Sequence, residues 1–368
     1  MRYEYWLAAI PILTDRKKRL LREEYGDAKA VYYIEEIQLR FLDYIEEREV
    51  EAILRAKKTK DVEKEWELLA DQNIRFVPYY DGEYPERLLQ TADPPYALYV
   101  KGSLPRQESA SVAIVGARKC TSYGEQMALE YGEYLASNGV QIISGMAKGI
   151  DGAGQRGALN GRGRTYGILG CGVDICYPRE HIGLYMDIQA SGGVISEKPP
   201  GCPPLPMYFP ARNRIISGLS DVLLVIEARQ RSGSLITADL ALEQGRDVYA
   251  LPGPVTSQLS IGCHQLIRQG AGILISPEEL LADLGIGDMS AEHKAEQKSD
   301  KIKKTLENHE NVVYSCLDLF PKGLDQLTAE TGLGARELLD GLISLELKGY
   351  IREISKNYYI RVRYEDKC

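Results

Sequence analysis

Apolar residues follow four different patterns along the 368-residue chain. In residues 1–72, Leu, Ile and Tyr recur at spacings of three and four, most clearly in 20–33 and 34–45. This period is typical of amphipathic helices. Gly26 interrupts the first run, so we expect a corner between two helices there. The charged run 55–67 is interpreted as a solvated helix face, with a phosphate-binding surface as the alternative.

Residues 73–110 are rich in residues that favour turns. Asp81-Gly82, Tyr84-Pro85 and Asp93-Pro94 each predict a turn, and one short apolar strand is expected at 97–100. We interpret this region as an extended lead-in to the following domain.

Residues 111–284 alternate between short apolar runs and helical segments of about a dozen residues. The runs are apolar throughout, which is typical of strands that helices cover on both faces. This pattern predicts an α/β fold with a doubly wound, Rossmann-like parallel sheet. The predicted strands are 112–115, 141–143, 165–169, 194–195, 222–226, 248–251 and 273–275.

The C-terminal residues have the pattern of a winged-helix module. A polar stretch, 285–304, is interpreted as a linker. A helix–turn–helix followed by a two-stranded wing is then expected in 305–363. Its predicted parts are a helix at 301–309, the apolar triplet Val312-Val313-Tyr314, a segment at 323–331, a helix at 335–348 and strands at 351–354 and 358–362. We thus expect an N-terminal helical domain (1–72), an extended core (73–284), the linker and the winged helix.

Composition narrows the possible functions. A net charge of −8 argues against a basic protein that wraps duplex DNA, so any nucleic-acid contact must come from a local cluster of Lys and Arg. The seven cysteines are scattered and form no CxxC pair, which fits free thiols in a reducing cytoplasm. The four histidines are far apart, so no metal site is expected. No run reaches the ~18 apolar residues of a membrane span, and 5–13 lacks the features of a signal peptide.

Glycine, serine and basic residues gather where the predicted strands end. Gly116-Ala117-Arg118, Ser144-Gly145 with Lys148-Gly149, and Ser232-Gly233-Ser234 each follow a strand. Ligands of open parallel sheets bind at this edge, where glycine and helix N-termini admit phosphate groups. The glycines could instead serve only tight turns. With the loops that begin at Gly170 and at Pro252 there are five such loops at one edge, which favours a phosphate-binding crevice.

The most distinctive motif is Arg212-Asn213-Arg214, at the start of a predicted helix. Arginine is unfavourable near a helix N-terminus, so contact with an anion is a better reason for it. Guanidinium groups bind phosphate and stack on exposed bases. The alternative is a structural ion pair with Glu197 or Glu227, which we expect for at least one of the two arginines.

The sequence lacks the motifs of common nucleotide enzymes. No GxGxxG follows the first strand, and no phosphate-binding loop with Lys-Ser/Thr occurs, so no cofactor is expected. Residues 111–284 contain 14 Lys and Arg against 16 Asp and Glu. A basic edge on a nearly neutral core fits a single nucleic-acid strand better than a duplex.

At these residues the chain resembles the DNA-processing protein family DprA, also called Smf. The resemblance covers the predicted core, and the flanking regions resemble domains that many members carry. The motifs that carry it are Val115-Gly116-Ala117-Arg118, Tyr123-Gly124, Ser144-Gly145-Met146-Ala147-Lys148-Gly149-Ile150-Asp151, Tyr177-Pro178, the segment from Phe209 to Ser220, Ser232-Gly233-Ser234 and Pro252-Gly253.

The resemblance implies a cytoplasmic, non-enzymatic protein that binds single-stranded DNA without sequence specificity. It also implies a homodimer formed through the core, which protects incoming DNA and loads the RecA recombinase in natural transformation. Carried over by position, Arg118, Lys148, Arg212 and Arg214 would contact phosphate, and Ser144, Gly145, Gly149 and Ser234 would shape the pocket. Asn213, Ser232 and Gly233 complete the predicted DNA-binding set.

One position departs from the family pattern, and two other functions remain open. Gln155 stands where the family usually has histidine, so any proton-transfer role of that histidine is in doubt here.

A phosphoribohydrolase-like enzyme would need a carboxylate such as Asp151, Asp174 or Glu227, although capping or loop bracing explains each more simply. A sequence-specific regulator would read DNA with helix 335–348, but this helix is net acidic, so a protein-interaction or accessory role is expected.

Overall fold

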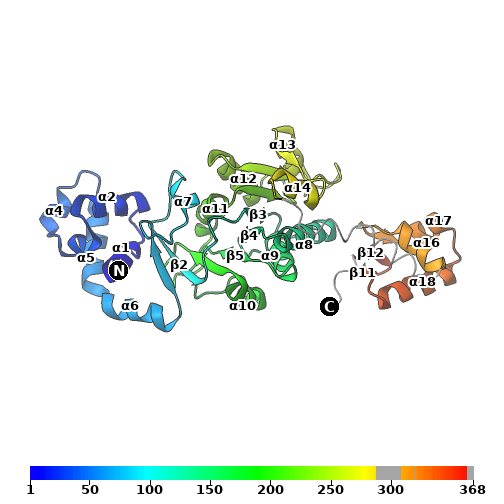
Figure 1. Ribbon diagram of the computed structural model, residues 1–368, viewed down its shortest axis with the longest axis horizontal. Helices are drawn as coiled ribbons and strands as arrows, with labels where there is room; N and C mark the ends of the chain where they lie inside the picture. The colour runs from blue at the N-terminus through cyan, green and yellow to red at the C-terminus, as the bar shows by residue number, and fades with distance from the viewer. Residues whose placement is uncertain (287–307, 319, 363–368) are drawn as a thin grey trace. The chain divides into compact units, whose positions relative to one another are not determined.

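The computed structural model of the chain describes residues 1–286, 308–318 and 320–362. The chain forms two compact units. The larger unit is built from Met1–Cys120 and Met127–Ile286, and it contains both the N-terminal helices and the sheet (Figure 1). The predicted boundary at residue 73 therefore lies inside one compact unit. The predicted linker lies almost entirely outside the described residues.

Within the described residues the larger unit has a nine-stranded sheet in the order β1-β2-β6-β5-β4-β3-β7-β8-β9. The seven strands from β3 to β9 are mutually parallel, so the predicted doubly wound α/β core is confirmed. The strands are β1 (Arg75–Pro78), β2 (Ala97–Gly102), β3 (Ser111–Val115), β4 (Gln141–Ser144), β5 (Thr165–Ile168), β6 (Gly193–Ser196), β7 (Val222–Val225), β8 (Asp247–Ala250) and β9 (Gly272–Ile273).

The lead-in region adds two antiparallel strands to this sheet, and only one of them was expected. β1 pairs with β2, and β2 pairs with β6, with Phe76 opposite Tyr99 and Tyr99 opposite Ser196. β1 has four residues and begins with the exposed Arg75, so its sequence shows no apolar run of its own. Pairing with β2 supplies the hydrogen bonds that make it a strand.

Helices cover both faces of the sheet, as Figure 1 shows for α10 on one side and α12 and α13 on the other. Alternate residues of β3 face opposite layers. Ala113 and Val115 belong to the cluster with α11, α12 and α13, while Ile114 lies against Gly154 of α9. These helices are α7 (Glu86–Leu89), α8 (Ser122–Ser137), α9 (Ile150–Asn160), η1 (Arg179–His181), α10 (Ile182–Ser191), α11 (Tyr208–Gly218), α12 (Gly233–Glu243), α13 (Ile261–Arg268) and α14 (Pro277–Asp283).

The N-terminal helices pack on the antiparallel end of the sheet. Trp6, Leu21 and Ile53 are fully buried and share one cluster with Phe76 of β1 and Tyr99 of β2. Gly26, with a φ of 89°, ends α2, so the predicted corner is confirmed. The helices are α1 (Arg2–Ala8), α2 (Asp15–Tyr25), α3 (Ala28–Tyr33), α4 (Glu36–Arg40), α5 (Glu47–Thr59) and α6 (Val62–Asp71).

The C-terminal unit has its own core, built around Val313, Leu327 and Leu342. The triplet Val312-Val313-Tyr314 lies inside α16, and most of the predicted helix 301–309 lies outside the described residues. The three helices and the β-wing agree with the predicted winged helix. Its elements are α16 (Asn308–Cys316), β10 (Lys322–Gly323), α17 (Leu324–Thr331), α18 (Ala335–Leu347), β11 (Ile351–Ser355) and β12 (Tyr358–Arg361).

None of the helices among the described residues is both long enough and apolar enough to cross a membrane. No group of three His, Cys, Asp or Glu side chains in this part of the chain is placed to bind a metal ion.

Candidate functional site

The order of the strands places a crevice at the carboxyl ends of β3 and β7. From β3 the chain moves outward through β4, β5 and β6, and it then returns to the other side of β3 as β7. The loops after β3 and β7 therefore lead to opposite sides of the sheet. This is the switch point at which open α/β sheets bind ligands.

The loops that follow β3 and β4 are packed backbone to backbone. Gly149 has a φ of +73°, and a Cβ atom there would lie 2.4 Å from the carbonyl oxygen of Ala117. The amide of Ile150 donates to that same oxygen at 3.3 Å. A Cβ atom at Gly116 would lie 2.7 Å from the side chain of Ile150. Glycine is thus required at both positions for the two loops to meet.

Arg212 lies beneath these loops, where it braces the strand ends. Its side chain is buried and donates from Nη1 to the carbonyl of Gly145, at 3.0 Å, and to that of Ile168. Asp151 accepts from the amide of Gly145 at 3.1 Å. A Cβ atom at Gly145 would lie 2.5 Å from Arg212 Nη1 and 2.7 Å from the Asp151 carboxylate. The arginine and the carboxylate therefore hold the end of β4 between them.

Burial dominates the electrostatics of this pair. It raises the pKa of Asp151, an effect that the nearby Arg212 and three backbone amides partly oppose. Burial also lowers the pKa of Arg212 to about 10, again with Asp151 acting in the opposite direction. A buried charge is costly unless hydrogen bonds or a nearby opposite charge offset the cost, and the attraction between Arg212 and Asp151 supplies part of that offset for each group.

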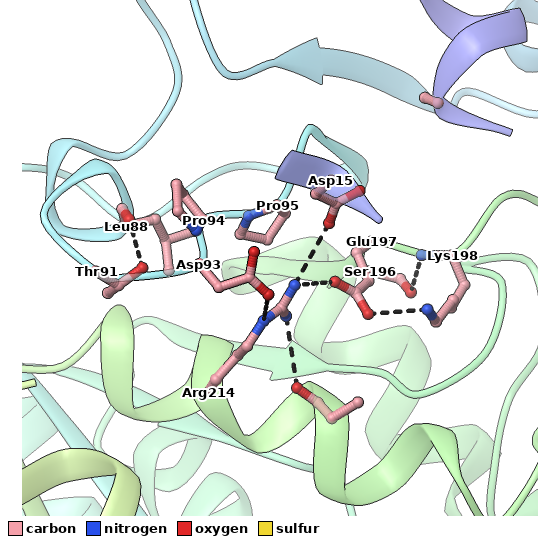
Figure 2. Close-up of polar contacts among 12 residues, drawn as sticks. Asp15, Leu88, Thr91, Asp93, Pro94, Pro95, Ser196, Glu197, Lys198 and Arg214 are labelled. Carbon is pink, nitrogen blue, oxygen red and sulfur yellow. Dashed lines mark hydrogen bonds and ion pairs between the residues drawn. The ribbon is translucent and has the colours of Figure 1, made fainter. Parts of the chain in front are cut away.

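Arg214 lies in a cluster of carboxylates (Figure 2). Its Nη2 atom is 2.6 Å from Glu197 and 3.4 Å from Asp15, and its Nε atom is 3.4 Å from Asp93. Burial by itself would lower the pKa of Arg214, but the three carboxylates outweigh it and the pKa is raised. The ion pair with Glu197 that the sequence left open as an alternative is thus present. Neither arginine of the motif is exposed in this structure.

Two exposed cations, the exposed ring of Tyr177 and the partly buried ring of Phe209 lie at the carboxyl edge near Arg212. The guanidinium carbon of Arg118 is 5.7 Å from the centre of the Phe209 ring, whose other neighbour is the ring of Tyr177 at 5.3 Å. Lys148 is exposed and pairs with the equally exposed Glu180 at 2.5 Å. An exposed ion pair of this kind is worth little, so Lys148 can exchange its partner for another anion.

The loop before α12 is linked to α11. Ser232 and Ser234 share a hydrogen bond of 2.6 Å between their hydroxyl oxygens. The side chain of Asn213 donates to the carbonyl of Gly233 at 3.5 Å. Gly233 is exposed, and a Cβ atom there would meet open space. Ser144 instead points inward and donates to the carbonyl of Ile114 at 2.6 Å, which makes it part of the sheet.

The eleven predicted site residues therefore fall into three groups. Arg118, Lys148 and Gly233 are exposed. Gly149, Asn213, Arg214 and Ser232 are partly buried, and Ser144, Gly145, Arg212 and Ser234 are buried. The prediction that these residues contact DNA remains a prediction. Sequence reasoning gave no role to Tyr177 and Phe209. Each of the two stands directly before a proline and lies inside a motif named above. That position is the feature of the sequence that could have pointed to them.

The carboxylates proposed for the alternative enzyme, and the unusual Gln155, have structural partners. Asp174 accepts from the amide of Gly201 at 2.9 Å, and Asp151 is engaged as described above. Gln155 is fully buried in α9 and donates to the carbonyl of Tyr166 at 3.0 Å. Its amide therefore braces α9 against β5, below the loops.

The family model described as DNA recombination-mediator protein A matches residues 75–285, and the DprA winged helix domain matches 297–355. Protein Smf of Escherichia coli K12 is 39% identical over 308 residues, which is 83% of this chain and 82% of that protein.

Two solved structures are also similar to the chain. The X-ray structure of DprA from Streptococcus pneumoniae has a TM-score of 0.67 at 35% identity and covers 77% of this chain and 98% of that one. DNA processing protein A from Helicobacter pylori, described as having a unique single-stranded DNA binding mode, has a TM-score of 0.52 at 29% identity. It covers 57% of this chain and 95% of that one.

Proposed function

The chain belongs to the DprA/Smf family of DNA recombination mediators, and we propose that it binds single-stranded DNA at the carboxyl edge of its parallel sheet. The observation that carries this proposal is the pairing of the exposed Arg118 with the ring of Phe209, directly above the braced loops. A guanidinium group binds a phosphate, and an aromatic ring stacks on a base. The two side chains together match the repeating unit of an unpaired strand.

The buried residues contribute by holding this edge in place. Arg212 and Asp151 fix the end of β4, and Gly149 allows the loop after it to touch the loop of Arg118. Groups fixed before binding lose little entropy on contact with a ligand, which favours affinity. In this proposal Arg212 supports the site from below, and Arg118 and Lys148 contact phosphate.

The absence of a base-reading motif fits binding without sequence specificity. Backbone contact and stacking are available to every nucleotide, whereas base discrimination needs hydrogen bonds to base edges. The similarity to the Helicobacter pylori protein, which is described as binding single-stranded DNA, supports this choice of ligand.

Family membership adds four further parts to the proposal. We infer that the protein protects incoming DNA, loads the RecA recombinase in natural transformation, is located in the cytoplasm and forms a homodimer. The dimer has one further support. β9 ends the sheet, and its residue Ile273 and the nearby Ile275 are 49% and 71% exposed. An apolar sheet edge is a surface that a second copy can cover.

The proposal is tested by a salt-titrated binding assay with a fluorescent oligothymidylate and the full-length chain. We expect Arg118→Ala to raise the Kd roughly tenfold, because a charge-assisted contact to phosphate is lost. The slope of log Kd against log salt should become shallower by about 0.7, the value for one phosphate of a single strand. Arg212→Ala is a poorer test, since removing a buried arginine disturbs the loops themselves.

Arg162→Ala is the matched control. Arg162 is exposed in the turn before β5, at the opposite edge of the sheet, and its removal changes the net charge by the same amount. We expect this variant to bind as tightly as the wild type. Equal losses in both variants, or equal affinity of the wild type for single and double strands, would contradict the proposal.

A further inference from the structure

Helix α11 directs two arginines of one motif to opposite sides. Arg212 and Arg214 are two positions apart, which corresponds to about 200° around a helix. Arg212 reaches the strand ends beneath the candidate site, whereas Arg214 points away into the carboxylate cluster of Figure 2. The same short helix begins with Tyr208 and Phe209, so the site and the cluster share one element.

The cluster joins three distant parts of the chain. Glu197 follows β6, Asp93 lies in the loop before β2, and Asp15 is the first residue of α2. The side chains of Arg214 and Asp15 are only 17% and 16% exposed. Asp15 also pairs with Lys18, at 3.2 Å, whose Nζ donates to the carbonyl of Ala8 at 2.8 Å. The N-terminal helices thus reach α11 through Asp15.

A second contact from α2 supports the same connection. Arg19 donates to the carbonyl of Pro94 and lies 3.9 Å from Asp93, the carboxylate that also meets Arg214. Burial alone would raise the pKa of Asp15, but Lys18 and Arg214 outweigh it and the pKa is lowered. Asp15 is therefore charged at neutral pH, where it can form its ion pair with Arg214.

We propose that Asp15 is a positioning residue through which the N-terminal helices hold α11 in the orientation that forms the DNA-binding edge. This inference rests on the proposed function and adds a determinant of affinity that does not touch DNA. The physical reason is that a helix moves as a rigid body. A shift of α11 on the Arg214 side displaces Phe209 and weakens the directional hydrogen bonds of Arg212 on the other side.

The test compares full-length Asp15→Asn with the wild type. Asparagine keeps the shape of the side chain and removes its charge. We expect the Kd for oligothymidylate to rise about two- to thirtyfold, the range for a residue that acts through another. The salt slope should stay unchanged, because no phosphate contact is removed. Hydrogen exchange of the α11 amides, residues 208–218, should become faster, and Asp15→Glu should restore most of the affinity.

Glu49→Gln is the matched control. Glu49 is buried in α5 and pairs with Lys17 of α2 at 2.7 Å, so its replacement breaks an ion pair within the N-terminal helices that does not reach α11. We expect this variant to lose stability while α11 exchange and DNA affinity stay as in the wild type. If Asp15→Asn folds poorly, Arg214→Lys gives the same test, because an ammonium group cannot serve the three carboxylates in the same geometry.

The possible failures can be told apart. If the wild type binds and Arg118→Ala weakens binding, but Asp15→Asn and Arg214→Lys both bind normally with unchanged exchange in α11, the positioning role is wrong and the proposed function stands. If Glu49→Gln weakens binding as much as Asp15→Asn, the effect is general loss of stability and the positioning role is again wrong. If the wild type does not bind single strands, the proposed function fails, while hydrogen exchange still tests the link to α11.

Discussion

The contribution of Phe209 to DNA affinity is the one that can be measured most easily apart from the contribution of charged groups. The centre of the Phe209 ring is 5.7 Å from the Arg118 guanidinium carbon and 5.3 Å from the centre of the Tyr177 ring. Stacking on one base is worth about 1–3 kcal/mol, so Phe209→Ala should raise the Kd for oligothymidylate by roughly five- to 150-fold. The salt dependence of binding should be unchanged, because stacking releases no counterions. Fluorescence anisotropy at three salt concentrations measures both quantities.

The control for this variant is Phe41→Ala. Phe41 ends α4 in the N-terminal region, and its side chain is 81% exposed. Its removal should leave DNA binding as it is. A change of salt slope in Phe209→Ala would show that the substitution had disturbed Arg118, and unchanged affinity would remove Phe209 from the site.

The two arginines of the motif show why residue type does not settle a residue's role. Both are basic and lie on one helix. The family resemblance assigned both to phosphate, whereas the motif itself predicted a structural ion pair for at least one of them. The structure buries Arg212 under the strand ends and surrounds Arg214 with carboxylates. Arg118 carries no such partner set and stays exposed. Which of these three arginines is exposed depends on how segments that are far apart in the sequence pack against one another.

At the scale of elements, α8 and α9 pack closely through glycines. A Cβ atom at Gly157 would lie 2.1 Å from the carbonyl oxygen of Leu129, and one at Gly132 would lie 2.2 Å from that of Gly154. Gly→Ala normally stabilises a helix by about 1 kcal/mol. Here the added methyl meets backbone, so we expect Gly157→Ala to lower the free energy of unfolding by about 1–3 kcal/mol. Urea denaturation measures the change.

Gly183→Ala provides the opposite case within the same unit. Gly183 lies in the first turn of α10, and a Cβ atom there would meet nothing within 4 Å. This variant should be neutral or more stable by less than about 1 kcal/mol. Equal effects of the two substitutions would show that α8 and α9 do not pack as described.

The strands of the core were predictable because their apolar runs are local features of the sequence. All seven predicted strands of 111–284 are present, and their burial on both faces follows from their composition. β1 was missed because four residues that begin with an exposed arginine have no pattern of their own. Its existence depends on β2, more than twenty residues later in the chain.

At the scale of the whole molecule, the larger unit should lose stability in alkali. Burial raises the pKa of Cys171 and of Cys263 to about 12, from an ordinary value near 9. Between these values the unfolded thiols are ionised while the folded ones keep their protons. The folded state then binds more protons, so stability is complete below pH 9 and falls as the pH rises. Each thiol contributes about 1.4 kcal/mol per pH unit.

The measurement is urea denaturation under reducing conditions from pH 8 to 10. The Cys171→Ala/Cys263→Ala variant will be less stable at every pH, but its stability should fall less steeply above pH 9. Over the whole range from pH 8 to 10, the two thiols together should account for about 2.7 kcal/mol of the stability that the wild type loses in excess of the variant. Parallel curves would show that neither thiol keeps its proton in the folded protein.

The sequence alone determined the class of fold, the positions of the core strands and the family, because hydrophobic runs, turn residues and motifs are read over short distances along the chain. It also indicated the edge of the sheet at which we propose the site, since the carboxyl ends of parallel strands meet there. Only the tertiary structure decided which residues of that edge are exposed. Arg214 meets Asp15 across 199 positions, and Arg212 meets Gly145 across 67. Such partners are brought together by packing, because the surroundings of a side chain depend on every segment that folds against it.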